Sequence, residues 1–135
     1  MVFENILFSN VDFTDTFFVD CEFNQVSFYN VTFTKSVFSN SSFDVVLFKN
    51  VTVDSSRFEN GNLERFLVRE SSFNNTNFDK TDIRASKWSY SSLENGVFQR
   101  SSMYIVIFRS FYVNDFIMVL STIENNIDAP DTANF

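Results

Sequence analysis

Every fifth residue of the chain is apolar, from Phe3 to Ile123, without interruption. An α-helix cannot use this period, because five residues advance about 500° around its axis and would spread the apolar side chains over every face. A flat strand cannot use it either, because an odd step sends alternate side chains to opposite faces. The pattern therefore predicts a chain that turns at each repeat and stacks its coils as a solenoid.

The residue two before each of these central positions indicates the size of one coil. Sorted by a period of 20, these residues fall into two mostly large columns, which are Ile6, Val26, Val46, Phe66, Ser86, Val106 and Val11, Val31, Val51, Ser71, Ser91, Phe111. The two mostly small columns are Cys21, Ser41, Gly61, Thr81, Ser101 and Thr16, Ser36, Ser56, Thr76, Gly96. A period of 15 mixes the two classes, so we expect four repeats per coil. About six such coils, at about 4.8 Å each, give a square rod about 30 Å long.

This register also predicts the core. Five aromatic residues one coil apart should form a single buried ladder, which consists of Phe18, Phe38, Phe58, Phe78 and Phe98. Residues 1–123 are expected to form the solenoid, and residues 124–135, which leave the pattern and contain the single proline, a C-terminal cap or a tail.

The five-residue units resemble those of pentapeptide-repeat proteins, in which a small residue and a polar residue precede a central Leu or Phe. Representative units are Val31-Thr32-Phe33-Thr34-Lys35, Ser41-Ser42-Phe43-Asp44-Val45 and Thr76-Asn77-Phe78-Asp79-Lys80. The resemblance implies an all-β fold, the right-handed quadrilateral β-helix. The handedness comes from the resemblance and not from the periodicity.

The composition excludes several classes of function. The chain has no His and one Cys, which removes His-dependent catalysis, an intramolecular disulfide and a CxxC metal or redox site. No cofactor or metal is expected. A net charge of −7 argues against direct nucleic-acid binding, and no apolar run is long enough to span a membrane. The first residues lack the features of a signal peptide, so we expect a cytoplasmic protein that is not an enzyme.

The last coil is expected to expose an unusual number of apolar residues, and the first coil far fewer. The outward positions concerned are Tyr104, Ile105, Ile107, Tyr112, Ile117, Val119 and Leu120. One interpretation is that the C-terminal tail covers them. The favoured one is a homodimer through this coil, because a contiguous apolar patch is costly to leave in water. The resemblance to gyrase-binding members of the family implies the same.

Charge is unevenly distributed over the four expected sides of the rod. One side, with Glu4, Glu22, Asp44, Glu64, Asp82 and Glu124 against Arg65 and Arg84, sums to −4. Another, with Asp12, Asp15, Asp54, Glu94 and Asp115 against Lys35, also sums to −4. The side between them is basic and partly apolar, and its candidate partner-binding residues are Leu47, Lys49, Leu67, Arg69, Lys87 and Tyr90.

These features favour a non-enzymatic scaffold that binds a protein of unknown identity. An alternative is a DNA mimic that binds DNA gyrase or another topoisomerase, because the resemblance to gyrase-protecting relatives implies that acidic sides can imitate DNA. The third interpretation is a toxin-receptor or adhesion domain. It rests on four glycosylation sequons, at Asn30, Asn40, Asn50 and Asn74, and on the resemblance to the Phe-rich luminal domain of synaptic-vesicle glycoproteins.

Overall fold

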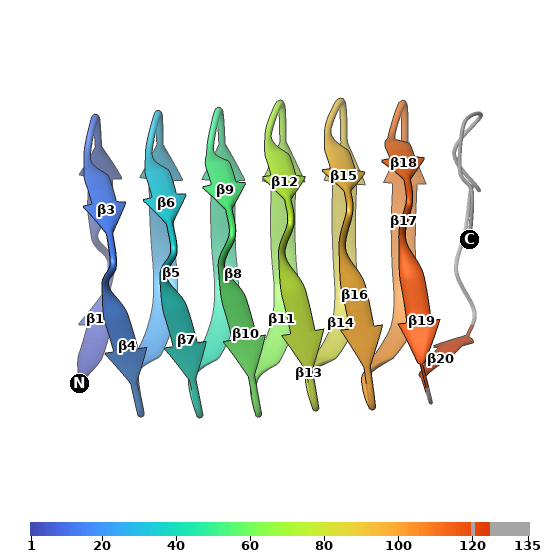
Figure 1. Cartoon of the computed structure of the whole chain (residues 1–135). Coiled ribbons are helices and arrows are strands. Elements are labelled where there is room, and N and C mark those ends of the chain that lie inside the picture. Colours follow the sequence, from blue (N-terminus) through green and yellow to red (C-terminus); the bar gives the residue numbers. More distant parts are fainter. Residues whose placement is uncertain (120, 125–135) are drawn as a thin grey trace.

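The computed structural model, which describes residues 1–119 and 121–124, shows a rod of stacked coils (Figure 1). Five long strands each carry two repeats: β5 (Glu22–Tyr29), β8 (Ser42–Lys49), β11 (Asn62–Arg69), β14 (Asp82–Ser89) and β17 (Ser102–Arg109). The short strands are β1 (Val2–Glu4), β2 (Leu7–Ser9), β3 (Asp12–Thr14), β4 (Phe17–Val19), β6 (Thr32–Thr34), β7 (Val37–Ser39), β9 (Thr52–Asp54), β10 (Arg57–Glu59), β12 (Ser72–Asn74), β13 (Asn77–Asp79), β15 (Ser92–Glu94), β16 (Val97–Gln99), β18 (Tyr112–Asn114), β19 (Ile117–Val119) and β20 (Thr122–Glu124). Within the described residues the regular elements are all strands, and no helix there could cross a membrane.

Three parallel sheets run the length of the rod. The first contains the long strands together with β1, β2 and β20, the second runs from β3 to β18, and the third from β4 to β19. Each residue pairs with the residue 20 positions later, as Phe58 does with Phe78. The predicted coil of four repeats is therefore confirmed.

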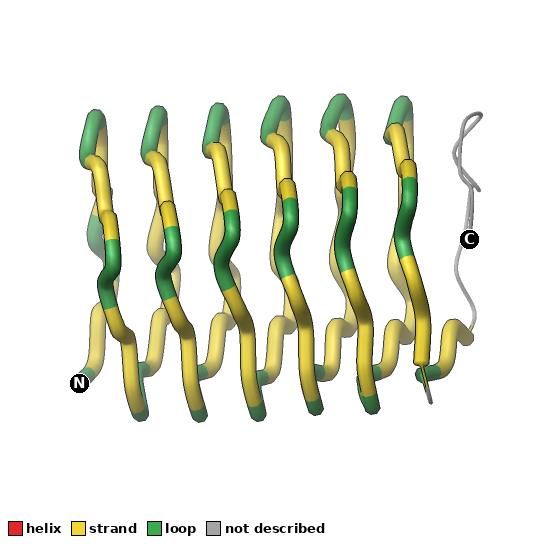
Figure 2. Tube along the Cα trace, in the orientation of Figure 1, coloured by secondary structure: helices red, strands yellow, loops and turns green. Residues whose placement is uncertain are grey.

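The rod is a right-handed β-helix. In Figure 1 the chain advances from the N-terminus on the left, the nearer strands such as β3 and β4 point downward, and the more distant β5 and β8 point upward. Strands and turns alternate regularly around each coil (Figure 2). The expected fold is confirmed, including the handedness.

A left-handed residue turns the chain after each repeat. Every fifth residue from Asn5 to Asp115 has a φ between 47° and 57°, and none of them is Gly. Asn and Asp tolerate this conformation well, whereas β-branched residues do not. Val45 and Ile105 occupy it nonetheless, with φ of 54° and 53°, and therefore hold strained backbone.

Phenylalanine rings fill the core in two alternating arrangements. Most rings one coil apart stack with nearly parallel planes, with centroids 4.9 Å apart for Phe18 and Phe38 and 4.8 Å apart for Phe38 and Phe58. Most consecutive rings within a coil meet edge to face, as Phe13 and Phe18 do at an interplanar angle of 72°. Both are favoured geometries for aromatic pairs. The same column continues through Phe78 and Phe98, whose centroids are 4.6 Å apart.

The small inward columns contain hydroxyl groups that satisfy buried backbone. The Ser41 hydroxyl accepts a hydrogen bond from the N–H of Cys21, in the coil before, at 3.1 Å. It also donates to the carbonyl of Ser39 at 3.1 Å. Ser101 does the same for the N–H of Thr81 and the carbonyl of Gln99. Small polar residues at these positions therefore provide hydrogen-bond partners for buried backbone N–H groups, so no water is needed there.

The core changes its composition toward the C-terminal end. Phe66 points inward from a position that holds Val in the two preceding coils, and its central neighbours, Leu63 and Val68, are smaller than the Phe residues they replace. Farther along, Phe116 lies one coil beyond Gly96. A methyl group on Gly96 would come within 3.0 Å of the Phe116 ring, so the missing side chain makes room for that ring.

Candidate interaction surfaces

The second half of each long strand, with the corner residue after it, forms a flat side that we call the basic face. It comprises residues 7–10, 27–30, 47–50, 67–70, 87–90 and 107–110. Two outward rows run along the rod on this face, since side chains two apart on a strand point to the same side. In register, the first row is Leu7, Ser27, Leu47, Leu67, Lys87, Ile107 and the second is Ser9, Tyr29, Lys49, Arg69, Ser89, Arg109.

The structure brings the six candidate partner-binding residues together on this face. Leu67 lies beside Leu47 in the coil before and beside Lys87 in the coil after, and Arg69 lies beside Lys49. Leu67 is 44% exposed, and Tyr90, at the corner, is 62% exposed. The result is a short apolar row next to a row of cations.

Two cation–π contacts order the long side chains of the face. The Lys49 ammonium lies 5.8 Å from the centre of the Tyr29 ring, and the Arg69 guanidinium lies 6.0 Å from that of Tyr90. Such contacts contribute about 0.5–1 kcal/mol at exposed sites. Sequence reasoning identified Lys49, Arg69 and Tyr90 but not these pairings, because each pair joins residues about one coil apart.

A shallow, open groove runs along the corner beside the basic face. Its walls include Asn50, Glu70, Ser72, Tyr90 and Ser92. The buried hydroxyls of Ser71 and Ser91, which also line it, donate hydrogen bonds to the backbone carbonyls of Arg69 and Ser89.

The sides that flank the basic face are acidic. The first acidic face covers residues 2–5, 22–25, 42–45, 62–65, 82–85 and 102–105, and the second covers residues 12–15, 32–35, 52–55, 72–75, 92–95 and 112–115. On the first, Asp44 forms a bidentate ion pair with Arg65, with a shortest N–O distance of 2.6 Å. On the second, the carboxylates of Asp54 and Glu94 lie two coils apart with Asn74 between them. The acidic groups are therefore scattered or partly neutralised.

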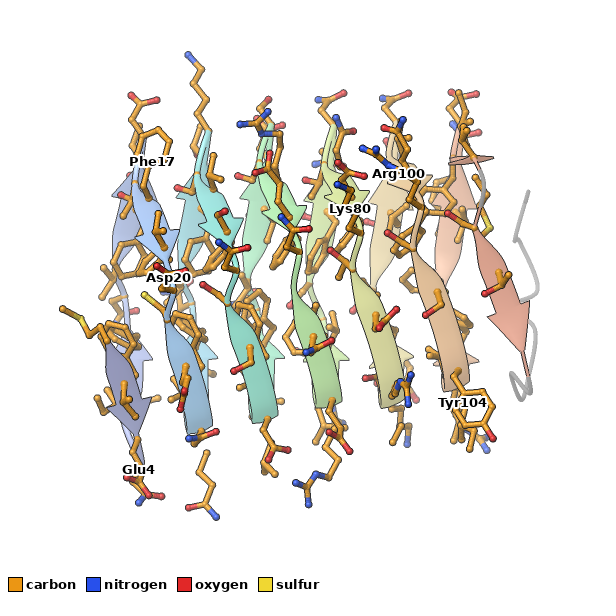
Figure 3. The ribbon with its side chains drawn as sticks, turned by 90° about the horizontal axis from the view of Figure 1, so that it is seen from below. Glu4, Phe17, Asp20, Lys80, Arg100 and Tyr104 are labelled. Atoms are coloured by element: carbon orange, nitrogen blue, oxygen red, sulfur yellow. The ribbon has the colours of Figure 1, made fainter. Side chains whose placement is uncertain are left out.

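The fourth side, which we call the neutral face, covers residues 17–20, 37–40, 57–60, 77–80 and 97–100 and continues with 117–119. Arg100 pairs with Asp79 at 2.7 Å, and Arg57 with Glu59 at 3.3 Å. Figure 3 shows Lys80 and Arg100 on this side of the rod.

The expected single apolar patch at the C-terminal coil is wrong. Tyr104 and Ile107 belong to the first sheet, Tyr112 to the second, and Ile117 and Val119 to the third, so these side chains surround the coil. Ile105 lies at the corner within β17, and Ile107 is half-buried and not fully exposed as expected. Leu120 lies outside the described residues.

The first coil exposes apolar residues as well, which corrects the expectation that it would expose far fewer. Phe17 is 68% exposed and lies at the N-terminal end of the rod, far from Tyr104 (Figure 3). Val2, Leu7 and Val19 are also exposed. The reason is that these residues occupy the outward positions on either side of the central Phe of their repeats.

The described residues include no metal-binding group, and Cys21 and the sequon residues Asn30 and Asn50 are placed as follows. Cys21 is buried, and its thiol donates a weak hydrogen bond to the carbonyl of Val19 at 3.5 Å. No group of three or more Cys, Asp or Glu side chains within residues 1–119 and 121–122 could hold a metal ion. Among the sequons, the amides of Asn50 and Asn30 donate to the coil before, to Asn30 and Asn10 respectively.

A family model matches the N-terminal part of the chain. Residues 4–44 match the family model described as pentapeptide repeats, in eight copies. The resemblance is thereby confirmed, and residues 4–44 are pentapeptide repeats. The same five-residue geometry continues to β20. No curated protein matches the sequence.

Three solved structures are similar to the chain at low identity. Full-length QnrB1, a plasmid-mediated fluoroquinolone resistance protein, is 11% identical over 93% of this chain and 87% of its own, with a TM-score of 0.30. Rfr23, a pentapeptide-repeat protein from the cyanobacterium Cyanothece 51142, is 7% identical over 95% and 91%, with a TM-score of 0.39. HetL, a pentapeptide-repeat protein involved in heterocyst differentiation regulation in the cyanobacterium Nostoc sp. strain PCC 7120, is 10% identical over 98% and 93%, with a TM-score of 0.32.

Proposed function

We propose that this protein is a non-enzymatic interaction module, a rigid rod that binds a protein partner through its basic face. The observation that carries the proposal is the combination of exposed Leu67 with the neighbouring cations Lys49, Arg69 and Lys87 on one flat, rigid side. Apolar and Arg or Tyr side chains together are typical of surfaces that carry binding energy between proteins.

The charge distribution defines the kind of partner. The whole chain carries −7, yet the basic face holds four cations and one carboxylate, Glu70. An acidic partner is repelled by the two flanking sides and attracted only here, which fixes where it docks. We therefore infer an acidic protein segment no wider than this face.

The test is affinity capture from the cells that make the protein, followed by quantitative mass spectrometry. Wild type is compared with Arg69→Glu and with Lys80→Glu, a matched charge reversal on the neutral face. The proposal expects at least one protein that is captured by wild type and Lys80→Glu and lost with Arg69→Glu. Equal capture by all three would overturn it.

Two other functions stay as predictions with weaker support. A gyrase-binding DNA mimic would use the acidic faces, but their carboxylates do not form a continuous row, and Asp44 is already paired with Arg65. A glycosylated adhesion or toxin-receptor domain would use the sequons. Three of their Asn residues, at positions 30, 40 and 50, are exposed at corners of the coil.

A further inference from the structure

The corner groove beside the basic face is a straight trough that runs along the rod, with a volume of about 640 Å³. Its first wall consists of corner residues one coil apart, which are Asn50, Glu70, Tyr90 and Ser110. Its second wall consists of residues that pair in register at the starts of β9, β12 and β15, which are Thr52, Ser72 and Ser92. The first wall spans three coil spacings, about 14 Å. A ligand that fills the groove must therefore be long and narrow and lie parallel to the rod.

The second wall presents a row of hydroxyl groups to solvent. Within the part of the chain that the structure describes, the side chains of Thr52, Ser72 and Ser92 make no hydrogen bond. The hydroxyls of Ser71 and Ser91 differ from them, because they are buried and donate to backbone carbonyls. A hydroxyl can donate one hydrogen bond and accept two. The wall thus suits a ligand that repeats donors and acceptors along its length.

Tyr90 provides a flat aromatic surface on the first wall. It is 62% exposed, and the Arg69 guanidinium lies 6.0 Å from the centre of its ring. This contact orders the side chain while most of it stays accessible. An aromatic ring combines an apolar surface with a polar tip, here the phenol hydroxyl. The C–H groups on one side of a sugar ring form a matching apolar surface, so a sugar that stacks on Tyr90 keeps its hydroxyls free for polar neighbours.

The charges near the groove disfavour an acidic ligand. Glu70 lies in the first wall, and its side chain is half exposed although it contacts Arg69 at 3.7 Å. Asp54 and Glu94 lie two residues beyond the second wall on β9 and β15, and they point outward as that wall does. A carboxylate is a strong acceptor for a hydroxyl group and repels another anion. The favoured ligand is therefore neutral and rich in hydroxyl groups.

An extended peptide fits this groove less well than a sugar chain. Peptides commonly bind to a sheet by adding a strand to its edge. Each of β9, β12 and β15 already pairs with a strand on both sides, so none of them is an edge. Among the described residues that line the groove, the one aliphatic side chain is Val51, which is 1% exposed. The groove thus provides neither free backbone nor an aliphatic surface for a peptide side chain.

We propose that the corner groove binds a linear, neutral oligosaccharide, with one sugar ring stacked on Tyr90 and its hydroxyl groups bonded to both walls. A pyranose unit advances a linear chain by a distance close to the coil spacing of about 4.8 Å, so successive units meet successive side chains of the second wall. This inference goes beyond the proposed function. The first wall belongs to the basic face, whereas the second wall lies on the second acidic face, outside the proposed partner surface.

The experiment probes an array of linear glycans with the intact, fluorescently labelled protein. The array carries neutral glucans, mannans and xylans, and polygalacturonate as an acidic comparison. Oligosaccharides of increasing length, made from a retained glycan, are then measured by isothermal titration calorimetry. We expect binding to a neutral glycan, with an affinity that rises up to about four units and then levels off, because the groove crosses only three coil spacings.

A matched pair of variants locates the glycan on the second wall. Thr52→Val removes a hydroxyl while keeping the shape of the side chain, and should weaken binding about fivefold. Thr32→Val makes the same change in the same outward row one coil earlier, at a residue that does not line the groove. It should change the affinity by less than about twofold. Circular dichroism checks that both variants keep the fold.

A second pair tests the aromatic platform. Tyr90→Ala should weaken binding about tenfold, and Tyr90→Phe, which keeps the ring, should bind more tightly than Tyr90→Ala. Tyr29→Ala removes another exposed tyrosine of the basic face, which does not line the groove, and should leave the affinity unchanged.

The other outcomes overturn the inference. If no neutral glycan binds, or if polygalacturonate alone binds, the groove does not have the proposed ligand. Equal losses for Thr52→Val and Thr32→Val would place the glycan elsewhere on the rod. Capture of a protein that is lost with Thr52→Val, without binding of any glycan, would assign the groove to a protein partner. The proposed function is tested separately, by affinity capture with Arg69→Glu.

Discussion

Phe58 and Phe78 lie one coil apart with their ring centroids 4.9 Å apart and their planes within 8° of each other. Their Cα atoms pair in register across β10 and β13, and both side chains are fully buried. A ring in this column is held from both sides by identical rings. When such a ring is removed, the surrounding structure cannot collapse into the cavity, because each coil is hydrogen-bonded to the coils on both sides through parallel strands.

Phe78→Ala should therefore be strongly destabilising. We expect a loss of about 3–5 kcal/mol in the free energy of unfolding, the cost of a large cavity that does not relax. Chemical denaturation followed by circular dichroism measures it. Arg84→Gln, an exposed change, serves as the control and should lie close to wild type. A loss below about 1 kcal/mol for Phe78→Ala would contradict the rigid stacking of this ladder.

Val45→Asn should stabilise the protein. Val45 is exposed at a corner with a φ of 54°, where a β-branched side chain is strained and Asn is tolerated. We expect a gain of about 1 kcal/mol in the free energy of unfolding. Asn60→Val, the reverse exchange at an equivalent corner with a φ of 51°, should lose a similar amount. The explanation fails if both variants unfold at the same denaturant concentration as wild type.

Gly96→Ala should destabilise the last coils. The added methyl group would lie 3.0 Å from the Phe116 ring and 3.1 Å from the Leu93 side chain, so one of them must move. Overpacking of this kind costs about 1–3 kcal/mol. Phe116→Leu in the same chain should recover part of the loss, because it shortens the side chain that the methyl group meets. Equal losses for the single and the double variant would mean that Phe116 is not the obstacle.

The homodimer through the C-terminal coil stays a prediction, and the neutral face offers a matched pair to test it. Ile117 and Phe17 occupy the same outward row at opposite ends of the rod and are 58% and 68% exposed. If the dimer exists, Ile117→Lys should shift the mass measured by light scattering from dimer to monomer, and Phe17→Lys should leave it unchanged. A wild type that is already monomeric would refute the dimer. If Phe17→Lys and not Ile117→Lys gave a monomer, the dimer interface would lie at the N-terminal end.

The gyrase hypothesis has its own assay. A DNA mimic should inhibit or protect gyrase in a supercoiling reaction, and reversing the charge of Asp12, Asp15 and Asp54 together should weaken the effect. We expect no effect of the wild type, because Asp12, Asp15 and Asp54 lie in three different rows and Asn74 separates Asp54 from Glu94. If wild type inhibits gyrase and the triple variant does not, the gyrase-binding function is favoured over binding of a partner through the basic face.

The sequence predicts the fold well because one spacing controls it. A central apolar residue at every fifth position admits only a chain that turns at each repeat, and the small columns that contain Ser41 and Ser56 fix the coil at 20 residues through their hydrogen bonds across coils. The composition of the basic face follows from the same register. Leu67 and Arg69 therefore come together with Leu47 and Lys49 as the spacing indicates.

What the sequence does not predict depends on neighbours in other coils. Ser89 is an outward residue by position and is nonetheless buried, in register between Arg69 and Arg109 of the neighbouring coils. Phe17 is exposed because it occupies an outward position of its repeat, in the same row as the exposed Ile117. The residues of the last coil share a stretch of sequence but point in different directions, which a count of apolar residues cannot reveal.

The most direct test of the central claim, that the basic face binds the partner, is photo-crosslinking from two positions. A photoreactive phenylalanine analogue replaces Leu67 on the basic face in one sample and Arg57 on the neutral face in another, both exposed. After irradiation in the cells that make the protein, we expect a crosslinked partner from position 67 and none from position 57. Crosslinks from position 57 alone, or of equal yield from both positions, would contradict the account.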